Sequence, residues 1–167
     1  ARDYFENTGN KTNPIFTKRT GADNPMDGVD VGRHGKPTMI DQDNDGDFDM
    51  WVGDVSGTLR YFENTGSKTN PAFTARAGAN NPMDGVDVGG WASPTLIDQD
   101  NDGDVDMWVG NSGGKLRYFE NMESKTDPAF TPRTGADNPM NGVVIVGSHA
   151  APTMIDQDND GDFDMWV

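Results

Sequence analysis

A nine-residue acidic run that occurs three times is the strongest constraint on how this chain folds. The run reads Asp-Gln-Asp-Asn-Asp-Gly-Asp-Phe-Asp at residues 41–49 and 156–164, and the copy at 98–106 differs only in a Val for the Phe. The three copies hold 15 of the 28 acidic residues and so account for the whole formal net charge of −15. The acidity is therefore local, and carboxylates held this close repel one another unless a cation neutralises them.

The spacing within each run is typical of a calcium-binding loop. Calcium takes about 6–8 oxygen ligands, which alternate positions of a tight loop can supply. Positions 1, 3, 5 and 9 would give side chains, position 7 its backbone carbonyl, and the Gly at position 6 permits the sharp turn. Gln42 and Asn44, at positions 2 and 4, are expected to face outward. With about three Ca²⁺ ions per chain, the predicted ligands are Asp41, Asp43, Asp45, Asp47 and Asp49 in the first loop, Asp98, Asp100, Asp102, Asp104 and Asp106 in the second, and Asp156, Asp158, Asp160, Asp162 and Asp164 in the third.

A solvated acidic loop, a magnesium site and an EF-hand fit the run less well. A solvated loop has no need of triplicated spacing, and magnesium prefers a rigid octahedron that keeps several waters. An EF-hand needs a Glu at position 12 and flanking helices. Position 12 here is Val52, Val109 or Val167, and the flanks are short apolar runs such as Met-Trp-Val. Such runs are typical of buried strands, so a strand–loop–strand unit is predicted.

The acidic loop belongs to a longer repeat. Tyr-Phe-Glu-Asn begins at Tyr4, Tyr61 and Tyr118, at intervals of 57 residues, and the third copy carries one extra residue near Val144–Val146. A period of this size with several short strands per unit indicates a propeller blade. One domain is expected over residues 1–167, with repeats at about 4–60, 61–117 and 118–167. The four strands of one unit are expected at Pro37–Asp41, Asp49–Gly53, Thr58–Asn64 and Pro71–Arg76, followed by a link over Ala77–Ser93.

Each end of the chain carries half of a blade. The chain begins with strands of the third and fourth types, near Tyr4 and Pro14, and ends with strands of the first and second types, near Pro152 and Asp164. Propellers typically have 4–8 blades. The predicted fold class is therefore an all-β propeller of four-stranded blades, three per chain. Two chains would exchange strands at their ends to form a homodimeric six-bladed ring. A fragment of a longer propeller is the alternative.

These repeats resemble the FG-GAP/VCBS class of calcium-binding β-propeller repeats, which includes the integrin α-subunit head. The resemblance rests on Asp-x-Asp-x-Asp-Gly-Asp-x-Asp, flanked by Pro-Thr-Met-Ile-Asp and Asp-Met-Trp-Val-Gly. Val-Gly, at Val31, Val88 and Val146, stands in place of the Phe-Gly dipeptide that gives the class its name. The resemblance implies extracellular adhesion or ligand binding, or a place beside the catalytic domain of a secreted polysaccharide-degrading enzyme.

Composition narrows the class of protein. Only 33% of the residues are hydrophobic, which disfavours one large core, while 21 Gly and 10 Pro supply turns. There is no Cys, hence no disulfide framework. No apolar stretch approaches the roughly 18 residues of a membrane span, so membrane insertion is not expected. The acidity disfavours nucleic acid as a partner. Weak calcium sites suit millimolar calcium, so an extracellular, secreted location is expected.

A planar ring stands three residues before the first-strand proline of every repeat. These residues are His34, Trp91 and His149, and they are the candidate ligand-binding residues. They lie in the links that vary most between repeats, on the face expected to be opposite the calcium loops. Loops on a rigid scaffold are the usual place for binding. Packing between blades or along the central shaft is the alternative. The tryptophans of the second strand, Trp51, Trp108 and Trp166, are predicted to be core residues instead.

The residues offer little support for catalysis. A nucleophilic triad needs a unique His, whereas both histidines occupy equivalent repeat positions. A glycosidase needs two free carboxylates, and the clustered ones are assigned to metal. The predicted function is a secreted, non-enzymatic binding or adhesion module, with glycan or an extracellular protein as ligand. The alternatives are an engineered or amplified self-assembling scaffold without a ligand and an accessory domain of a polysaccharide-acting enzyme.

Overall fold

Short antiparallel strands make up the ordered framework of this chain. The computed structural model describes residues 3–143 and 147–167, and the extra residue predicted near Val144–Val146 lies outside them. Within the described residues there are twelve strands and three single turns of 3-10 helix. The strands are β1 (Tyr4–Asn7), β2 (Phe16–Arg19), β3 (Lys36–Ile40), β4 (Asp49–Gly53), β5 (Leu59–Asn64), β6 (Phe73–Arg76), β7 (Ser93–Ile97), β8 (Asp106–Gly110), β9 (Leu116–Asn121), β10 (Phe130–Arg133), β11 (Thr153–Ile155) and β12 (Asp164–Trp166).

The strands form two complete and two half sheets. β3-β4-β5-β6 and β7-β8-β9-β10 are four-stranded and antiparallel, with neighbours in sequence paired throughout. β1–β2 and β11–β12 are two-stranded. Each of the four strand types occurs three times, as predicted, and the half sheets lie at the chain ends. The all-β, blade-like organisation is therefore confirmed, whereas closure into a ring stays a prediction.

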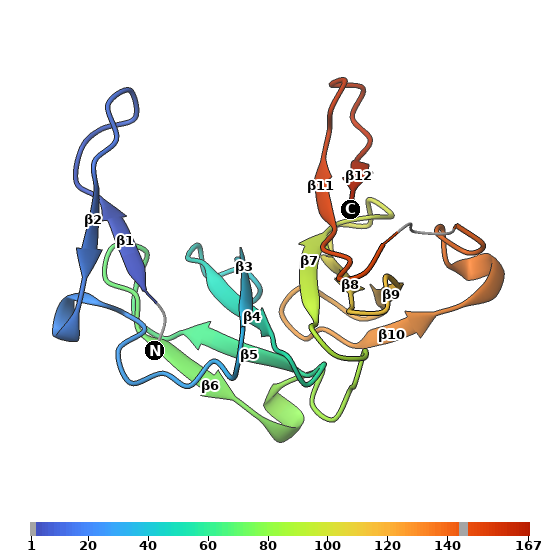
Figure 1. The fold of residues 1–167 in the computed structure, drawn as a ribbon, viewed down its shortest axis with the longest axis horizontal. Coiled ribbons are helices and arrows are strands. Elements are labelled where there is room, and N and C mark those ends of the chain that lie inside the picture. Colours follow the sequence, from blue (N-terminus) through green and yellow to red (C-terminus); the bar gives the residue numbers. More distant parts are fainter. Residues whose placement is uncertain (1–2, 144–146) are drawn as a thin grey trace.

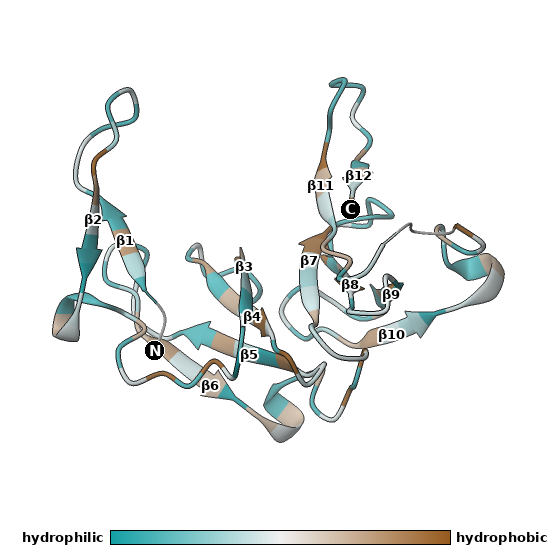
Figure 2. Ribbon diagram, viewed as in Figure 1, coloured by the Kyte–Doolittle hydropathy of each residue, from teal (hydrophilic) through white to brown (hydrophobic). Residues whose placement is uncertain are grey.

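The four sheets follow one another along an open arc (Figure 1). β3 contacts β7, and β7 contacts β11, so the first strands of successive units lie side by side. β1–β2 stands at one end of the arc and β11–β12 at the other (Figure 1). The apolar residues fall in short stretches, whereas the loop that joins β11 and β12 is largely hydrophilic (Figure 2). This pattern suits a chain that buries its apolar surface between thin sheets.

The main core lies between the two complete sheets. Trp51 is fully buried and stacks on Tyr61, with ring centroids 4.8 Å apart. These rings belong to the same buried cluster as Met107, Val109 and Phe119 of the next sheet. Side chains alternate across a strand, so Met50 and Val52 point to the other side of β4 and form a second cluster with Phe62. Each sheet thus packs with both faces, which explains why β4 is buried along its whole length.

The links between units hold more structure than their sequence indicates. Each contains a 3-10 turn, at Gly21–Asp23, Gly78–Asn80 or Gly135–Asp137. Met83 and Val88 of the second link are buried in the main core. Gly53, at the end of β4, lies against the backbone carbonyl of Ala92, so a Cβ there would collide with main chain. Among the described residues, no helix is long and apolar enough to cross a membrane.

Candidate metal loops and the opposite loop face

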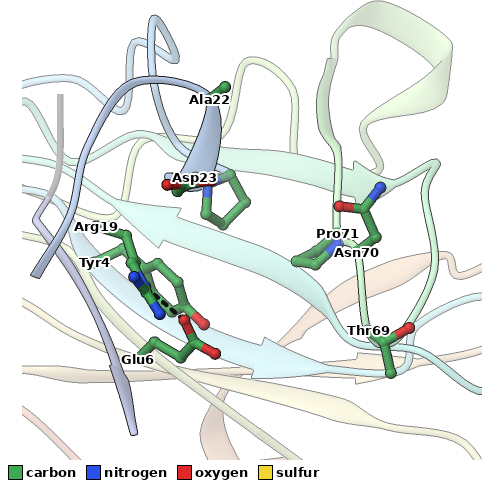
Figure 3. A pocket seen from close by; sticks show the side chains of 9 residues that line it. Tyr4, Glu6, Arg19, Ala22, Asp23, Thr69, Asn70 and Pro71 are labelled. Atoms are coloured by element: carbon green, nitrogen blue, oxygen red, sulfur yellow. Dashed lines mark hydrogen bonds and ion pairs between the residues drawn. The ribbon is translucent and has the colours of Figure 1, made fainter. Parts of the chain in front are cut away.

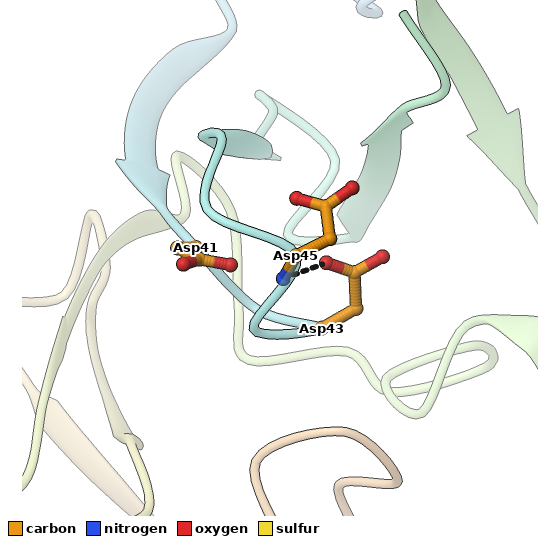
Figure 4. A group of neighbouring side chains, drawn as sticks. All are labelled: Asp41, Asp43 and Asp45. Atoms are coloured by element: carbon orange, nitrogen blue, oxygen red, sulfur yellow. Dashed lines mark hydrogen bonds between the residues drawn. The ribbon is translucent and has the colours of Figure 1, made fainter. Parts of the chain in front are cut away.

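Each acidic loop gathers its first three aspartates around one point. In the first loop, Asp41, Asp43 and Asp45 each offer a carboxylate oxygen, and these oxygens all lie within 4.8 Å of one another (Figure 4). Asp98, Asp100 and Asp102 do the same in the second loop, and Asp156, Asp158 and Asp160 in the third. The loop lies between the first and second strands of its unit, as predicted.

Backbone hydrogen bonds fold the loop inward on its own carboxylates. The Gly46 amide donates to Oδ2 of Asp41 at 3.2 Å, and the Asp47 amide donates to Oδ1 of Asp45 at 3.0 Å. Asn44 has a φ of 62° and Gly46 a φ of 98°, both in the left-handed region. Asn and Gly tolerate that region better than other residues do. The second and third loops repeat these angles to within a degree, so the residue types at positions 4 and 6 fix the turn.

Two carboxylate oxygens of the first loop are buried and have no hydrogen-bond partner among the described residues. They are Oδ1 of Asp41 and Oδ1 of Asp47, and the whole Asp47 residue is only 8% exposed. Buried polar atoms are nearly always hydrogen-bonded, because an unpaired one loses its water without compensation. A cation held by positions 1, 3 and 5 would satisfy Oδ1 of Asp41, whereas position 7 is predicted to offer its backbone carbonyl. The ligands that the loop offers are all oxygen atoms, the ligand type that calcium takes.

Asp43 shows the electrostatic cost of the loop without a cation. Burial raises the pKa of Asp43 above its ordinary value, and the charges of Asp45, Glu63 and Asp41 add to the rise against an opposing backbone hydrogen bond from Asp45. The pKa of Asp100 in the second loop is raised for the same reasons, burial first and then Asp102. A bound cation acts in the opposite direction, because it favours the charged form.

The aspartate at position 9 is tied into the sheet. Oδ2 of Asp49 accepts hydrogen bonds from the Gln42 amide at 3.0 Å and the Tyr61 hydroxyl at 3.1 Å, and Oδ1 accepts one from the Asn64 amide at 2.7 Å. Asp49 is 1% exposed, and burial raises its pKa despite these bonds. Asp106 repeats the whole arrangement with Gln99, Tyr118 and Asn121. The position-9 carboxylate thus joins the loop to the third strand, and its predicted part in holding metal stays a prediction.

The outward orientation predicted for Gln42 is wrong. Gln42 is 2% exposed, its Oε1 accepts a hydrogen bond from Trp51 Nε1 at 3.2 Å, and its Nε2 donates to the Lys125 carbonyl at 2.9 Å. Lys125 lies between β9 and β10 of the other complete sheet, so Gln42 bridges two sheets. Asn44 is exposed as expected and accepts a hydrogen bond from Lys125 Nζ. In the first loop, position 2 therefore faces the core and position 4 faces solvent.

A polar pocket between the sheets, beside the first loop, was not predicted from the sequence. Arg76 makes two hydrogen bonds to Glu63, each 2.7 Å long, across the β5–β6 pair. Both residues line a cavity of about 350 Å³ together with Asp43 and Gln42. The signal that could have revealed the ion pair is its recurrence at a separation of 13 residues, as Glu6 with Arg19 and as Glu120 with Arg133.

The three predicted ring residues form one continuous row. His34 and Trp91 have ring centroids 4.8 Å apart, and Trp91 and His149 have centroids 5.2 Å apart. The two histidines are exposed and Trp91 is half-buried. The rings thus pack on one another while keeping surface exposed. All three have a left-handed backbone, with φ of 52°, 63° and 64°, which is unusual for bulky residues.

Hydrogen bonds to the turns between second and third strands hold the backbone of Trp91 and of His149. The Trp91 amide donates to the Val55 carbonyl at 3.1 Å, and the His149 amide donates to the Ser112 carbonyl at 3.2 Å. Val55 and Ser112 lie in the turns between second and third strands. The structure therefore brings together the two loop types that vary most between repeats, at the opposite ends of the strands from the acidic loops, as predicted.

Comparison with protein-family models, with curated proteins and with solved structures found no match to this chain.

Proposed function

We propose that this chain is a non-enzymatic, calcium-stabilised β-propeller module of the FG-GAP/VCBS type, secreted and used to bind an extracellular ligand, with carbohydrate as the favoured class. The observation that carries the ligand part is the row formed by His34, Trp91 and His149. The observation that carries the calcium part is the set of three like carboxylate groups. The two parts lie on opposite loop faces, which lets one face be rigid while the other varies.

The acidic loops act as staples in this proposal. Bound calcium would supply positive charge at the point where the carboxylates of positions 1, 3 and 5 meet. The chain contributes the left-handed turn at Asn44 and Gly46, which directs those carboxylates inward. It also contributes Asp49 and Gln42, which join the loop to Tyr61 and Trp51 in the core. Metal binding then stabilises the folded state by mass action.

The row of rings suits the apolar face of a sugar. Aromatic rings provide large, stiff contact surfaces with polar edges. The Trp91 and His149 amides each donate a hydrogen bond to a turn carbonyl of the adjoining sheet, so these two residues lose little conformational freedom on binding. Within the described part of the chain, the ring of His34 contacts Trp91, and the ring of His149 contacts Trp91 and Ser148, rather than a carboxylate. This arrangement favours recognition over acid–base chemistry.

Isothermal titration with calcium tests the metal part. The protein is expected to bind three Ca²⁺ per chain, and Asp45→Ala is expected to remove one of them. Asp127→Asn is the matched control, because Asp127 is an exposed acid outside the loops and the other repeats carry Asn13 and Asn70 there. Heat signals that Asp45→Ala leaves unchanged, or a melting temperature indifferent to calcium, would refute this part.

A glycan array probed with the calcium-loaded protein tests the ligand part. Binding to a glycan is expected, and Trp91→Ala is expected to abolish it while the calcium-dependent melting temperature stays within about 2 °C of the wild type, a change of under 1 kcal/mol. Met122→Thr, at an exposed position on another loop, is the control. Loss of folding in Trp91→Ala would support a packing role. No bound glycan across the array would favour a scaffold without a carbohydrate ligand.

A further inference from the structure

The half sheets at the two chain ends expose side chains whose counterparts in the other repeats are buried. Tyr4 is 36% exposed, whereas its counterpart Tyr61 is 6% exposed. Trp166 is 62% exposed, whereas its counterparts Trp51 and Trp108 are 0% and 1% exposed. We propose that β11–β12 of a second copy of this chain pairs with β1, and that two copies exchange these strand pairs reciprocally to complete two four-stranded sheets.

The complete sheets give the register of this pairing. In both of them the second strand pairs antiparallel with the third, with Trp51 opposite Tyr61 and Trp108 opposite Tyr118. Those pairs stack, with centroids 4.8 Å and 4.6 Å apart. The same register places Trp166 of the second copy opposite Tyr4. It also places Met165 opposite Phe5, and Val167 opposite Asp3.

A cavity beside β1 has the lining that surrounds a tryptophan elsewhere in the chain. It measures about 520 Å³, and its walls include Tyr4, Met26, Met50, Val52 and Phe73. The counterparts of these five residues, one repeat later, are Tyr61, Met83, Met107, Val109 and Phe130, all of which belong to or pack against the cluster that contains Trp51. Trp51 meets Phe130 edge to face at 5.9 Å. The indole of Trp166 from a second copy would make the same contact with Phe73.

A second cavity lies beside the same half sheet, and Figure 3 shows side chains that line it. It measures about 280 Å³ and is lined by residues that include Tyr4, Glu6 and Arg19. The equivalent cavity between the complete sheets has the counterparts of every one of its lining residues and, in addition, Gln42 and Asp43. Those two residues come from the acidic loop between the first and second strands. Their counterparts are Gln157 and Asp158, which lie in the loop between β11 and β12.

The polar groups at the two ends are complementary as well. Asp164 is exposed and accepts a hydrogen bond from the Gln157 amide at 3.1 Å. Asp49 accepts the equivalent bond and two more, from the Tyr61 hydroxyl and the Asn64 amide. In the proposed pairing, Tyr4 and Asn7 of the other copy provide the two further donors to Asp164.

The geometry selects a second copy as the occupant. The two half sheets of one chain stand at opposite ends of the arc (Figure 1), so a chain does not complete its own sheet. Propellers close with about 4–8 blades. Each chain carries strands for three sheets. Two copies would therefore form six blades, which is within that range, whereas one copy would form three blades and three copies would form nine. A reciprocal exchange is also isologous, and it leaves neither β1 nor β12 with an unpaired edge that could recruit further copies.

The mass of the calcium-loaded protein in solution, measured by light scattering, tests the pairing. Twice the chain mass of 18.1 kDa is expected. Trp166→Ala is expected to raise the dissociation constant of the dimer by roughly 30-fold or more, the factor that corresponds to loss of an interface hot spot. Met122→Thr, which removes an exposed side chain away from both ends, should leave the mass unchanged. A wild-type protein that stays at the mass of one chain at millimolar concentration would overturn the proposal.

An engineered disulfide tests the register. The chain has no cysteine, and directly opposed strand residues have Cα atoms about 4.5–5.5 Å apart, within disulfide reach. The double variant Asp3→Cys/Val167→Cys is expected to run at twice the chain mass on a denaturing, non-reducing gel, and neither single variant should. A cross-linked single chain would mean that the chain closes on itself. A ladder of higher masses would mean open-ended assembly. Either result would overturn the reciprocal pairing without bearing on calcium or ligand binding.

Discussion

The indole Nε1 of Trp51 donates a hydrogen bond to Oε1 of Gln42 at 3.2 Å, and this bond ties the second position of the acidic loop to the buried centre of β4. Trp108 and Gln99 repeat it at 3.1 Å. Gln42 therefore joins the loop to the core and to the other complete sheet. Its Oε1 accepts the hydrogen bond from Trp51, and its Nε2 donates one to the Lys125 carbonyl. Calcium bound in such a loop would stabilise the contact between neighbouring sheets as well as the turn itself.

Gln42→Ala is expected to destabilise the protein by about 1–3 kcal/mol, because it leaves Trp51 Nε1 buried without an acceptor. Gln99→Ala is expected to cost less. Gln99 keeps the bond to Trp108 but, within the described residues, donates none to a carbonyl of the following unit, and its side chain is less buried. Urea unfolding of both variants in calcium measures the difference. Equal effects would show that the Lys125 bond contributes nothing.

Asp49→Asn is expected to lower the free energy of unfolding by about 1–3 kcal/mol. The amide replaces one of two acceptor oxygens with a donor, so one of the amide or hydroxyl donors that face Asp49 loses its acceptor.

Asp164→Asn is the matched variant at the equivalent position, where the Gln157 amide is the one donor among the described residues of the same chain. Its effect should fall on the association of two copies and hardly on the unfolding of one. Chemical denaturation and light scattering separate the two, and an unfolding effect equal to that of Asp49→Asn would contradict this.

The strand positions followed closely from the sequence, because apolar runs and turn residues mark them locally. The prediction for β4, Asp49–Gly53, agrees with the structure at both ends. β6 begins at Phe73, two residues after the predicted start at Pro71, and the Ala72 amide between them donates to the side-chain Oδ1 of Asn64 at 2.8 Å and not to the backbone of the partner strand.

The features that the sequence did not reveal depend on contacts between distant residues. Gln42 looked like a solvent-facing loop residue, since its spacing matches the outward positions of a calcium loop. Its partner Lys125 lies 83 residues away, and no local pattern encodes that contact. The row formed by His34, Trp91 and His149 was predicted as three equivalent positions, but direct contact between the rings depends on how closely neighbouring sheets approach.

The close approach of neighbouring sheets depends on the glycine at the end of each second strand. Gly53→Ala would place a Cβ against the Ala92 backbone carbonyl, and Gly110→Ala would do the same at Ala150. Main chain cannot move aside cheaply, so Gly53→Ala is expected to destabilise the protein by about 2 kcal/mol or more, within the range of overpacking. Gly113→Ala is the control, because the nearest atom to its Cβ is Oδ1 of Asn111 at 3.4 Å, an ordinary contact, and its φ is not in the left-handed region. Thermal unfolding of both variants tests this, and a tolerated Gly53→Ala would mean that the sheets are not held this close.

The stabilising effect of calcium is expected to decrease as the pH falls. Burial raises the pKa values of Asp43, Asp49, Asp100 and Asp106 above the ordinary 3.8 in the metal-free protein. A raised carboxyl pKa means that the folded state binds protons more tightly than the unfolded chain. For these groups, stability is therefore fully present below pH 3.8 and is lost as the pH rises through the raised values. Calcium has the opposite dependence, because it binds the ionised form and competes with the proton.

Melting temperatures measured with and without calcium, at a series of pH values from about 7.5 down to about 4.5, test this expectation. The protein for the calcium-free series is prepared by exhaustive dialysis, because chelators themselves lose affinity in acid. The gap between the two series should be widest near neutral pH and should narrow steadily on acidification. Magnesium at the same concentration serves as the control and should open a smaller gap, since it gives up its waters reluctantly. A gap that stays constant across the series would show that these aspartates do not bind the ion.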